Sequence, residues 1–342
     1  MERYLGIDVG SVTTKLVVIN EDNQPIFTLY ERTNGRPVNA IQQAFNNLAQ
    51  TLGNDLNIRG VGTTGSGRQL ASIMVGADEI RTEITAHATA AKECCPQVST
   101  VIDIGGQDSK IIYIKQGVST GFNMNTVCAA GTGSFLDHQA TRLGIEIEEF
   151  GDYALRSTSP VKIAGRCGVF AESDLIHKQQ MGYPPEDLIA GLCISLARNF
   201  LQNVARDPRG KKVLPTVLFQ GGVAANVGMR SAFEHLIRQP LVVPEYFKVM
   251  GAWGAALLAK RRIQRTGVAT QFRGVDRIAT FDCHPGSFTC SDCSNNCEIS
   301  ELYIDDQLVS RWGSRCAKWE NLSLSSEGRH DETEAPLGTV IA

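Results

Sequence analysis

The chain has 342 residues, which exceeds one typical compact domain and predicts two lobes with a small additional module. Its formal net charge of −3 offers no basic surface for nucleic acid, and its apolar runs fall far short of the ~20 residues that span a membrane. The N-terminus shows no signal-peptide pattern, so we expect the ten cysteines to be reduced thiols of a cytoplasmic protein.

Two β-rich starts, each followed by helices, organise most of the chain. In the first we expect strands at 4–8, 15–20, 24–30 and 60–63 and helices at 38–52 and 79–94. In the second we expect strands at 100–104, 109–114, 118–123 and 216–219 and helices at 132–143, 169–182, 185–206 and 252–262. The two starts predict one lobe at 1–98, which a helix at about 250–265 closes, and another at 99–249.

The opening strands of the two starts carry the same motif. An aspartate, a glycine and a lysine recur at identical spacing, as Asp8, Gly10 and Lys15 and again as Asp103, Gly105 and Lys110. In both cases the lysine opens an apolar strand. Two hairpins can look alike by chance, but the shared motif and the shared order of three strands favour a true duplication.

A hairpin loop of this kind suits a phosphate group. Glycine lets the backbone approach closely, and backbone N–H groups and hydroxyls can donate to phosphate oxygens. The candidate ligands in the two loops are Gly10, Ser11, Val12, Thr13, Thr14, Lys15, Gly105 and Gly106. The candidate catalytic residues are Asp8, Asp103 and Gln107. The aspartates could hold Mg²⁺ through water or orient the attacking water.

Two glycine-rich turns add further candidates. A Gly-Gly turn after the strand at 216–219 permits the close approach of a base or ribose. A glycine-rich start of the helix at 132–143 suits phosphate, because the N–H groups of a helix N-terminus are free. The candidate residues are Gly221, Gly222 and Val223 in the first turn and Gly131, Thr132 and Gly133 in the second. Each turn alone is also compatible with an ordinary tight turn or helix cap.

The order of the two hairpins and the Gly-Gly turn resembles the superfamily of actin, sugar kinases and heat-shock chaperones. The strings NTVCAAGTGSFLD and GRCGVFAESDLIH are similar to the ATPase activators of 2-hydroxyacyl-CoA dehydratases and the ATPase subunits of benzoyl-CoA reductases. The resemblance covers roughly residues 3–262. It implies an α/β fold of two duplicated actin-like lobes that close on ATP. It also implies an ATPase that drives low-potential electron transfer to a dehydratase or reductase partner.

Cys128 and Cys167 each lie close to the expected start of a helix, where the helix dipole favours the thiolate. A four-thiolate site then requires two chains, and without the resemblance two buried free cysteines are the simpler interpretation. The resemblance implies one 4Fe-4S cluster shared by a homodimer, with ferredoxin or flavodoxin as the electron donor. His87 is interpreted as a packing or interlobe residue rather than a catalytic one.

The last part of the chain differs in composition. Residues 280–320 hold Cys290, Cys293, Cys297 and Cys316, a set typical of either zinc or a second iron–sulfur cluster. A hairpin is expected at 300–310, and the polar residues 321–342 predict a disordered tail. This module departs from the short activators and resembles a segment of longer members of their family.

Two other functions fit the same fold. A small-molecule kinase for a sugar or acyl substrate needs an acceptor pocket, and it gives no reason for Cys128 and Cys167. A chaperone-like or filament-forming ATPase needs a peptide-binding domain or a polymer surface, for which the sequence has no clear segment. The reductive activator is therefore the favoured interpretation.

Overall fold

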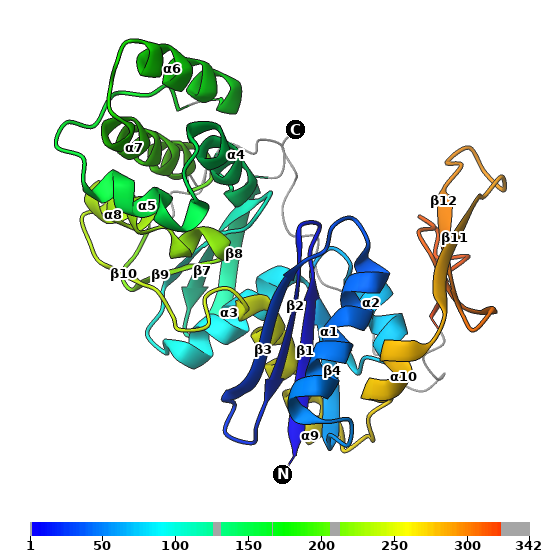
Figure 1. Ribbon diagram of the computed structural model, residues 1–342. Coiled ribbons are helices and arrows are strands. Elements are labelled where there is room, and N and C mark those ends of the chain that lie inside the picture. The colour runs from blue at the N-terminus through cyan, green and yellow to red at the C-terminus, as the bar shows by residue number, and fades with distance from the viewer. Residues whose placement is uncertain (1, 126–130, 166, 206–212, 323–342) are drawn as a thin grey trace. The chain divides into compact units, whose positions relative to one another are not determined.

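The computed structural model describes residues 2–125, 131–165, 167–205 and 213–322 of the chain. These residues form two units, a larger one that ends at Thr280 and a C-terminal one that begins at Phe281 (Figure 1). In the larger unit, two five-stranded sheets each carry their own helices. Within the described residues, no helix has the length and apolar character needed to cross a membrane.

The first sheet, called lobe I together with its helices, has the strand order β3-β2-β1-β4-β5. Its strands are β1 (Arg3–Val9), β2 (Thr13–Ile19), β3 (Pro25–Arg32), β4 (Ile58–Thr64) and β5 (Glu79–Ile80). The first three strands form an antiparallel meander, and β4 and β5 continue the sheet in parallel. β1 and β2 are largely buried, whereas β3 alternates between half-buried and exposed residues as an edge strand does.

The second sheet, called lobe II together with its helices, repeats this plan. Its strands are β6 (Thr100–Ile104), β7 (Ser109–Lys115), β8 (Val118–Asn125), β9 (Val217–Gln220) and β10 (Leu241–Val242). The order β8-β7-β6-β9-β10 matches that of lobe I strand for strand, again with an antiparallel meander and two parallel strands. The sheet topology therefore contains the duplication that the two sequence motifs predict.

The helices divide between the lobes in the same way. Those of lobe I are α1 (Pro37–Leu52), α2 (Arg68–Val75), α3 (Glu83–Cys94), α9 (Met250–Thr266) and α10 (Val275–Thr280). Those of lobe II are α4 (Gly133–Leu143), α5 (Ile147–Leu155), α6 (Gly168–Gln180), α7 (Pro185–Asn203), the 3-10 helix η1 (Gly222–Ala225) and α8 (Val227–Ile237). The sequence pattern did not predict α2, α5, α8 and α10, because short helices beside glycine-rich turns give little periodicity.

The prediction of one helix over 79–94 is wrong at its start. Glu79 and Ile80 form the edge strand β5, and the helix begins only at Glu83. The buried carboxylate of Glu79 accepts from Arg81 at 2.5 Å and from Arg262 on α9 at 3.2 Å. These two charge-assisted bonds hold the segment against the sheet, and local sequence periodicity does not reveal them.

Helix α9 returns the chain from lobe II to the sheet of lobe I, where it packs on β1, β4 and α3. Glycines make this approach possible. A Cβ atom on Gly6 would lie 1.9 Å from the carbonyl oxygen of Ala252, and one on Gly62 would lie 2.1 Å from that of Ala255. The helix backbone therefore lies directly against the sheet at these positions, with no side chain between them.

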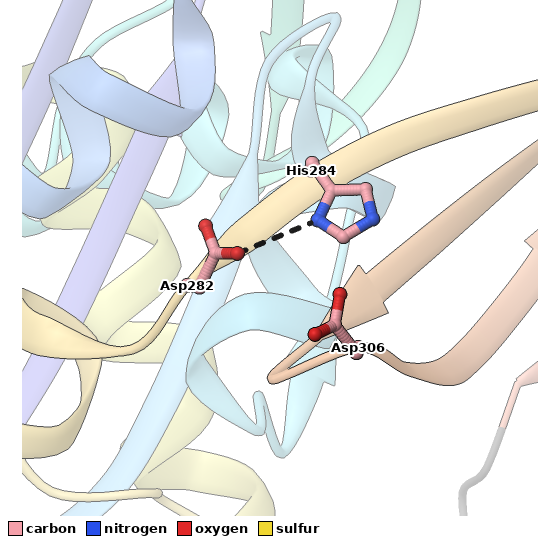
Figure 2. A group of neighbouring side chains, drawn as sticks. All are labelled: Asp282, His284 and Asp306. Atoms are coloured by element: carbon pink, nitrogen blue, oxygen red, sulfur yellow. Dashed lines mark ion pairs between the residues drawn. The ribbon is translucent and has the colours of Figure 1, made fainter.

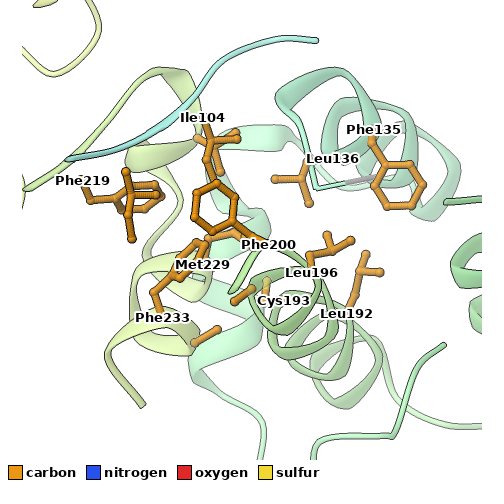
Figure 3. Packing of buried hydrophobic residues seen from close by; sticks show 14 of the residues in the cluster. Ile104, Phe135, Leu136, Leu192, Cys193, Leu196, Phe200, Phe219, Met229 and Phe233 are labelled. Atoms are coloured by element: carbon orange, nitrogen blue, oxygen red, sulfur yellow. The ribbon is translucent and has the colours of Figure 1, made fainter. Parts of the chain in front are cut away.

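The core of lobe II lies between its sheet and helices that include α4, α7 and α8 (Figure 3). The ring of Phe233 packs edge-on against Phe200 at 5.5 Å and against Phe219 at 5.4 Å between centroids. Cys193 belongs to the same core, and burial raises the pKa of its thiol to about 12. Because Ile104 ends β6 and Phe219 lies in β9, this core fixes the two strands that lead into the glycine-rich turns.

The C-terminal unit is a four-stranded antiparallel sheet of β11 (Cys283–Thr289), β12 (Glu298–Ile304), β13 (Gln307–Trp312) and β14 (Asn321–Leu322). The hairpin expected at 300–310 is confirmed, and Asp305 and Asp306 at its tip have φ angles of 51° and 60°. Two left-handed residues form the tight turn that suits a twisted hairpin. Most of the tail predicted at 321–342 lies outside the described residues, from residue 323 onwards.

The close approach of α9 predicts that lobe I does not tolerate a side chain at Gly6. We expect Gly6→Ala to lower the free energy of unfolding by about 3 kcal/mol, because helix and sheet must move apart to admit the methyl group. Gly35→Ala is the control, since nothing lies within 4 Å of its Cβ position and only its φ of +67° opposes the change. That variant should lose about 1 kcal/mol. Equal losses in urea unfolding would contradict the packing argument.

Candidate active site

A cavity of about 160 Å³ lies where the loops of the two repeated motifs meet. It brings together most of the loop residues that the sequence predicts. These are Asp8, Gly10, Ser11, Val12, Thr13, Lys15, Asp103, Gly105, Gly106, Gln107, Gly221 and Gly222. The other lining residues are not among the site residues predicted from the sequence. These are Tyr30, Ser66, Glu83, His87, Asp108, Lys110, Phe247 and Lys248.

The two hairpin loops share one backbone geometry. In the first loop the N–H of Gly10 donates to the carbonyl of Thr13 at 2.9 Å, and in the second the N–H of Gly105 donates to that of Asp108 at 3.0 Å. The loops also meet, because a Cβ atom on Gly106 would lie only 3.0 Å from the side chain of Val12. Two matched loops therefore face one cavity, as the duplicated motif predicts.

Each loop follows a buried aspartate that pairs with a lysine on the next strand. Asp8 lies opposite Lys15 in the β1–β2 ladder, and their charged atoms are 3.2 Å apart. Asp103 lies opposite Lys110 in the β6–β7 ladder, at 3.4 Å. Burial alone would lower the pKa of both lysines, but the aspartates hold it above the ordinary value. Both lysines therefore remain charged.

Glu83, at the start of α3, also points its carboxylate at the second loop. Its oxygen lies 3.3 Å from the ammonium of Lys110, which also pairs with Asp108 at 2.9 Å. Burial raises the pKa of Glu83 above its ordinary value, although Lys110 opposes this. A carboxylate with a raised pKa is a better proton acceptor than an ordinary one. Glu83 is therefore a candidate base that was not predicted from the sequence.

A second network joins α3 of lobe I to the sheet of lobe II. The amide nitrogen of Gln220 donates to Nδ1 of His87 at 2.7 Å and to Oδ1 of Asp103 at 3.3 Å. Nε2 of His87 lies 3.7 Å from Oδ2 of Asp103. Burial alone would raise the pKa of Asp103, but His87 and Lys110 lower it to about 2. Asp103 is therefore an anion at physiological pH.

His87 is an interlobe residue, as the sequence predicts, and it also lines the cavity. A Cβ atom on Gly251 of α9 would lie 2.5 Å from Oδ2 of Asp8 and 3.3 Å from Cε1 of His87. Asp8 and His87 therefore converge on the same point of α9. Glu83 and His87 are four residues apart on one helix, a spacing that places both on one face. That spacing is the signal by which the sequence could have revealed them as a pair.

Some predicted ligands do not line the cavity. Among the described residues they are Thr14, Gly131, Thr132, Gly133 and Val223. Thr14 is buried in β2, with 1% of its surface exposed. The N–H groups of Gly133 and Ser134 donate to the carbonyls of Gly105 and Gly106, at 2.8 and 2.9 Å. These two groups are not free for phosphate, and the start of α4 supports the second loop instead.

Cys167 occupies the position directly before α6, as its place in the sequence predicts. Its carbonyl accepts from the N–H of Ala171 at 2.9 Å, and its thiol is half-buried. The first turn of α6 carries two large apolar side chains on the surface, Val169 at 70% and Phe170 at 67% exposure. Cys128, the other predicted cluster ligand, lies outside the described residues.

The C-terminal unit holds a small group of possible metal ligands other than the four predicted cysteines, and of this group the sequence suggests only His284, beside Cys283. Asp282, His284 and Asp306 place their ligand atoms within 4.8 Å of one another (Figure 2). All three are exposed, and His284 pairs with Asp282 at 3.7 Å while its ring stacks on Tyr303. The predicted ligands Cys290, Cys293, Cys297 and Cys316 are all described, and no three of their sulfur atoms come that close together.

Two duplicated lobes, whose matched aspartate and glycine loops face one cavity, define an ATPase of the actin-like class. Lysines at this cavity can neutralise phosphate, and carboxylates can bind a hard metal ion. Residues 5–259 match the BadF/BadG/BcrA/BcrD ATPase family, and the chain belongs to this family.

The relatives agree in sequence and in structure. The (R)-2-hydroxyglutaryl-CoA dehydratase activating ATPase of Acidaminococcus fermentans is 35% identical over 269 residues, which are 75% of this chain and 97% of that protein. A subunit of the benzoyl-CoA reductase of Thauera aromatica is 30% identical over 268 residues, which are 74% of this chain and 91% of that protein. A solved structure of the activator of the 2-hydroxyisocaproyl-CoA dehydratase from Clostridium difficile has bound ADPNP. It matches with a TM-score of 0.69 and 31% identity, over 78% of this chain and 97% of that one.

These relatives confirm the family, the actin-like fold and the ATPase class that the sequence predicts. Their names are those of activators and of one component of a reductase, which favours the activator over the small-molecule kinase. The family match ends at residue 259, within α9. The C-terminal unit therefore lies outside it.

The environment of Asp103 predicts how stability depends on pH. Its pKa of about 2 in the folded protein lies below the ordinary value of 3.8, so the ionised carboxylate stabilises the fold above pH 3.8. As the pH falls from about 4 to about 2, this group's contribution of about 2 kcal/mol should disappear. In guanidinium unfolding, the free energy of unfolding of Asp103→Asn should therefore fall less steeply between about pH 4 and about pH 2 than that of wild type. Asp152→Asn changes an exposed residue, and it should keep the pH dependence of wild type. Identical slopes for wild type and Asp103→Asn would contradict the assignment.

Proposed function

We propose that this chain is an ATP-dependent reductive activator. It hydrolyses ATP and couples hydrolysis to electron transfer from an iron–sulfur cluster to a 2-hydroxyacyl-CoA dehydratase or a related reductase. The observation that carries the proposal is the combination of two matched phosphate loops with a half-buried thiol at the start of α6. The named functions of the relatives support the same conclusion.

The proposal gives ATP the cavity between the two loops, with its phosphates at the loop N–H groups and at Lys15 and Lys110. Mg²⁺ fits the acidic side of this cavity, since Asp8 and Asp103 both face it and carboxylate oxygens are its preferred ligands. The buried Oε1 of Gln220, beside Asp103, has no hydrogen-bond partner among the described residues. It is a ready acceptor for a water molecule of a hydrated ion. The ion supplies further neutralisation of phosphate charge when bound.

Glu83 is the proposed base for hydrolysis. Its raised pKa and its place beside Lys110 support a role in taking a proton from the attacking water. The aspartates are less suited to this role, because Asp103 is held as a weak base by His87 and Lys110 and Asp8 is paired with Lys15. His87 and Gln220 then act as positioning residues that fix Asp103.

We expect Glu83→Gln to lower the turnover number of ATP hydrolysis about 100-fold, because the amide cannot accept the proton. Nucleotide affinity should change little, since the variant keeps the size and polarity of the side chain. Glu148→Gln, an exposed substitution on α5, is the matched control and should hydrolyse ATP at the wild-type rate. Steady-state phosphate release and nucleotide titration separate the two effects. Hydrolysis by Glu83→Gln at the wild-type rate would remove Glu83 from the mechanism.

The proposed cluster is a 4Fe-4S cluster held by Cys128 and Cys167 of each subunit in a homodimer. The half-buried thiol of Cys167 at a helix N-terminus suits a thiolate ligand. The exposed Val169 and Phe170 beside it form an apolar surface of the kind that a second subunit covers. Ferredoxin or flavodoxin is the proposed electron donor, and a reducing cytoplasm is the proposed location, because free thiols persist there.

Hydrogen bonds connect the nucleotide cavity with the start of α4. The second phosphate loop accepts hydrogen bonds from the start of α4 at Gly133 and Ser134. That start follows Cys128 by only a few residues. A change in the loop on nucleotide binding or hydrolysis would therefore reach the start of α4. This connection supports the coupling of hydrolysis to the state of the cluster.

Iron content tests the proposed function. Protein with Cys167→Ala, purified without oxygen, should lose about four irons per homodimer relative to wild type. It should still bind ATP, because Cys167 lies outside the cavity. Cys94→Ser is the control, since this cysteine is no proposed ligand. Unchanged iron in Cys167→Ala, or transfer of phosphate from ATP to a sugar or acyl acid by wild type, would overturn the proposal.

A further inference from the structure

We propose that the C-terminal unit binds a second 4Fe-4S cluster, within a single chain, through Cys290, Cys293, Cys297 and Cys316. This site is separate from the shared cluster of the proposed function, because it lies in another unit of the fold and needs no second subunit. Each chain would then carry one redox centre of its own.

Three of the four cysteines lie in one closed loop between β11 and β12. Cys290 directly follows β11 and Cys297 directly precedes β12. The N–H of Cys290 donates to the carbonyl of Cys297 at 2.8 Å, so these two residues face each other where the loop leaves the sheet. Within the loop, the N–H of Asn296 donates to the carbonyl of Cys293 at 3.2 Å. The loop is therefore folded back on itself around its three cysteines.

The segment after β13 brings the fourth cysteine to this loop. Gly313, with a φ of +108°, turns the chain close to the backbone of Glu298 at the base of the loop. Lys318 then bonds to Asp292 within the loop. Cys316 lies only two residues before Lys318, so this ion pair holds the segment that carries Cys316 at the loop.

Trp319 covers the sulfur of Cys290 and donates a hydrogen bond to it. Its indole N–H donates to the Sγ atom at 3.2 Å, and its ring packs edge-on against Phe288 at 5.0 Å. The guanidinium of Arg311 lies 5.3 Å from the centre of the same ring. Hydrogen bonds to sulfur and nearby cations stabilise thiolates that hold a metal group. The loop thus has ligands of the right type, and one of their sulfurs already accepts a hydrogen bond.

The spacing of the sulfur atoms favours a cluster over a single zinc ion. A tetrahedral zinc site with Zn–S bonds of about 2.3 Å holds its sulfurs only about 3.8 Å apart. No three of these four sulfurs lie within 4.8 Å of one another, which is wider than the spacing in a zinc site. A four-iron cluster gives each thiolate a different iron, and its thiolates therefore stand further apart.

The order of the cysteines along the chain agrees with this choice. Structural zinc sites commonly pair two turns of the C-x2-C type. Here only Cys290 and Cys293 form such a turn, and the other two ligands are single residues. Three cysteines within one short loop and a fourth from elsewhere are instead typical of 4Fe-4S ligation.

Iron analysis of the full chain tests the proposal. Wild type purified without oxygen should contain about six irons per chain, four in the C-terminal unit and half of the four shared by the dimer. Cys293→Ser with Cys316→Ser changes two exposed residues, so folding should persist and about four irons per chain should be lost. Cys167→Ala should lose only about two, so failure of the proposed function is distinguishable from failure of this proposal.

Three results would overturn the second cluster. The first is that wild type contains zinc in place of iron and that the double variant loses this zinc. The second is that the double variant keeps the metal content of wild type. The third is that the C-terminal unit of wild type contains no metal. Trp319→Phe adds an independent readout, because it removes the N–H donor to Cys290 while keeping an aromatic ring. It should retain the iron and shift the reduction potential of one cluster to a more negative value. An unshifted potential would contradict the placement of Cys290 as a ligand.

Discussion

The larger unit depends on two buried ion pairs, one at the base of each glycine-containing hairpin loop. Asp8 pairs with Lys15 and Asp103 with Lys110, and each pair joins directly opposed residues of an antiparallel ladder. A buried charge that loses its partner costs about 3–5 kcal/mol, so a slip of one residue in either ladder is strongly disfavoured. The ion pairs therefore fix the register of the hairpins, and the register places Gly10 and Gly105 in the turns. The two ion pairs also place two carboxylates and two ammonium groups at one cavity.

These hairpins could be predicted from the sequence because their information is local. Aspartate, glycine and lysine lie within eight residues of one another, and alternating apolar residues define the strands on either side. The network around Asp103 could not be predicted in this way. His87 and Gln220 are 133 residues apart and meet only when both lobes have formed. The spacing of Glu83 from His87 gave a usable signal, but the half-buried position of the Glu83 carboxylate beside Lys110 could not be predicted from the sequence.

Two sets of predicted ligands lie outside the cavity, one at the start of α4 and one in the C-terminal unit. They show a second limit of prediction from sequence. A glycine-rich helix start offers N–H donors, yet a loop carbonyl and a phosphate oxygen compete for them on equal chemical terms. In this fold the carbonyls of Gly105 and Gly106 take those of Gly133 and Ser134. In the C-terminal unit, the spacing of four cysteines predicts a ligand set but does not distinguish zinc from a cluster. The wide separation of their sulfur atoms in the folded loop is the further observation that favours a cluster.

Helix α9 also affects the order in which the molecule can be assembled. Lobe I is discontinuous in sequence, since its sheet is made first and the helix that covers it is made after all of lobe II. On the ribosome, the face of the sheet at Gly6 and Gly62 must wait uncovered while lobe II emerges. An uncovered sheet face usually promotes aggregation, because it exposes large apolar side chains. Gly6 and Gly62, which allow the helix to approach, have no side chain. The uncovered face of the sheet therefore exposes less apolar surface at these positions to which another chain could bind.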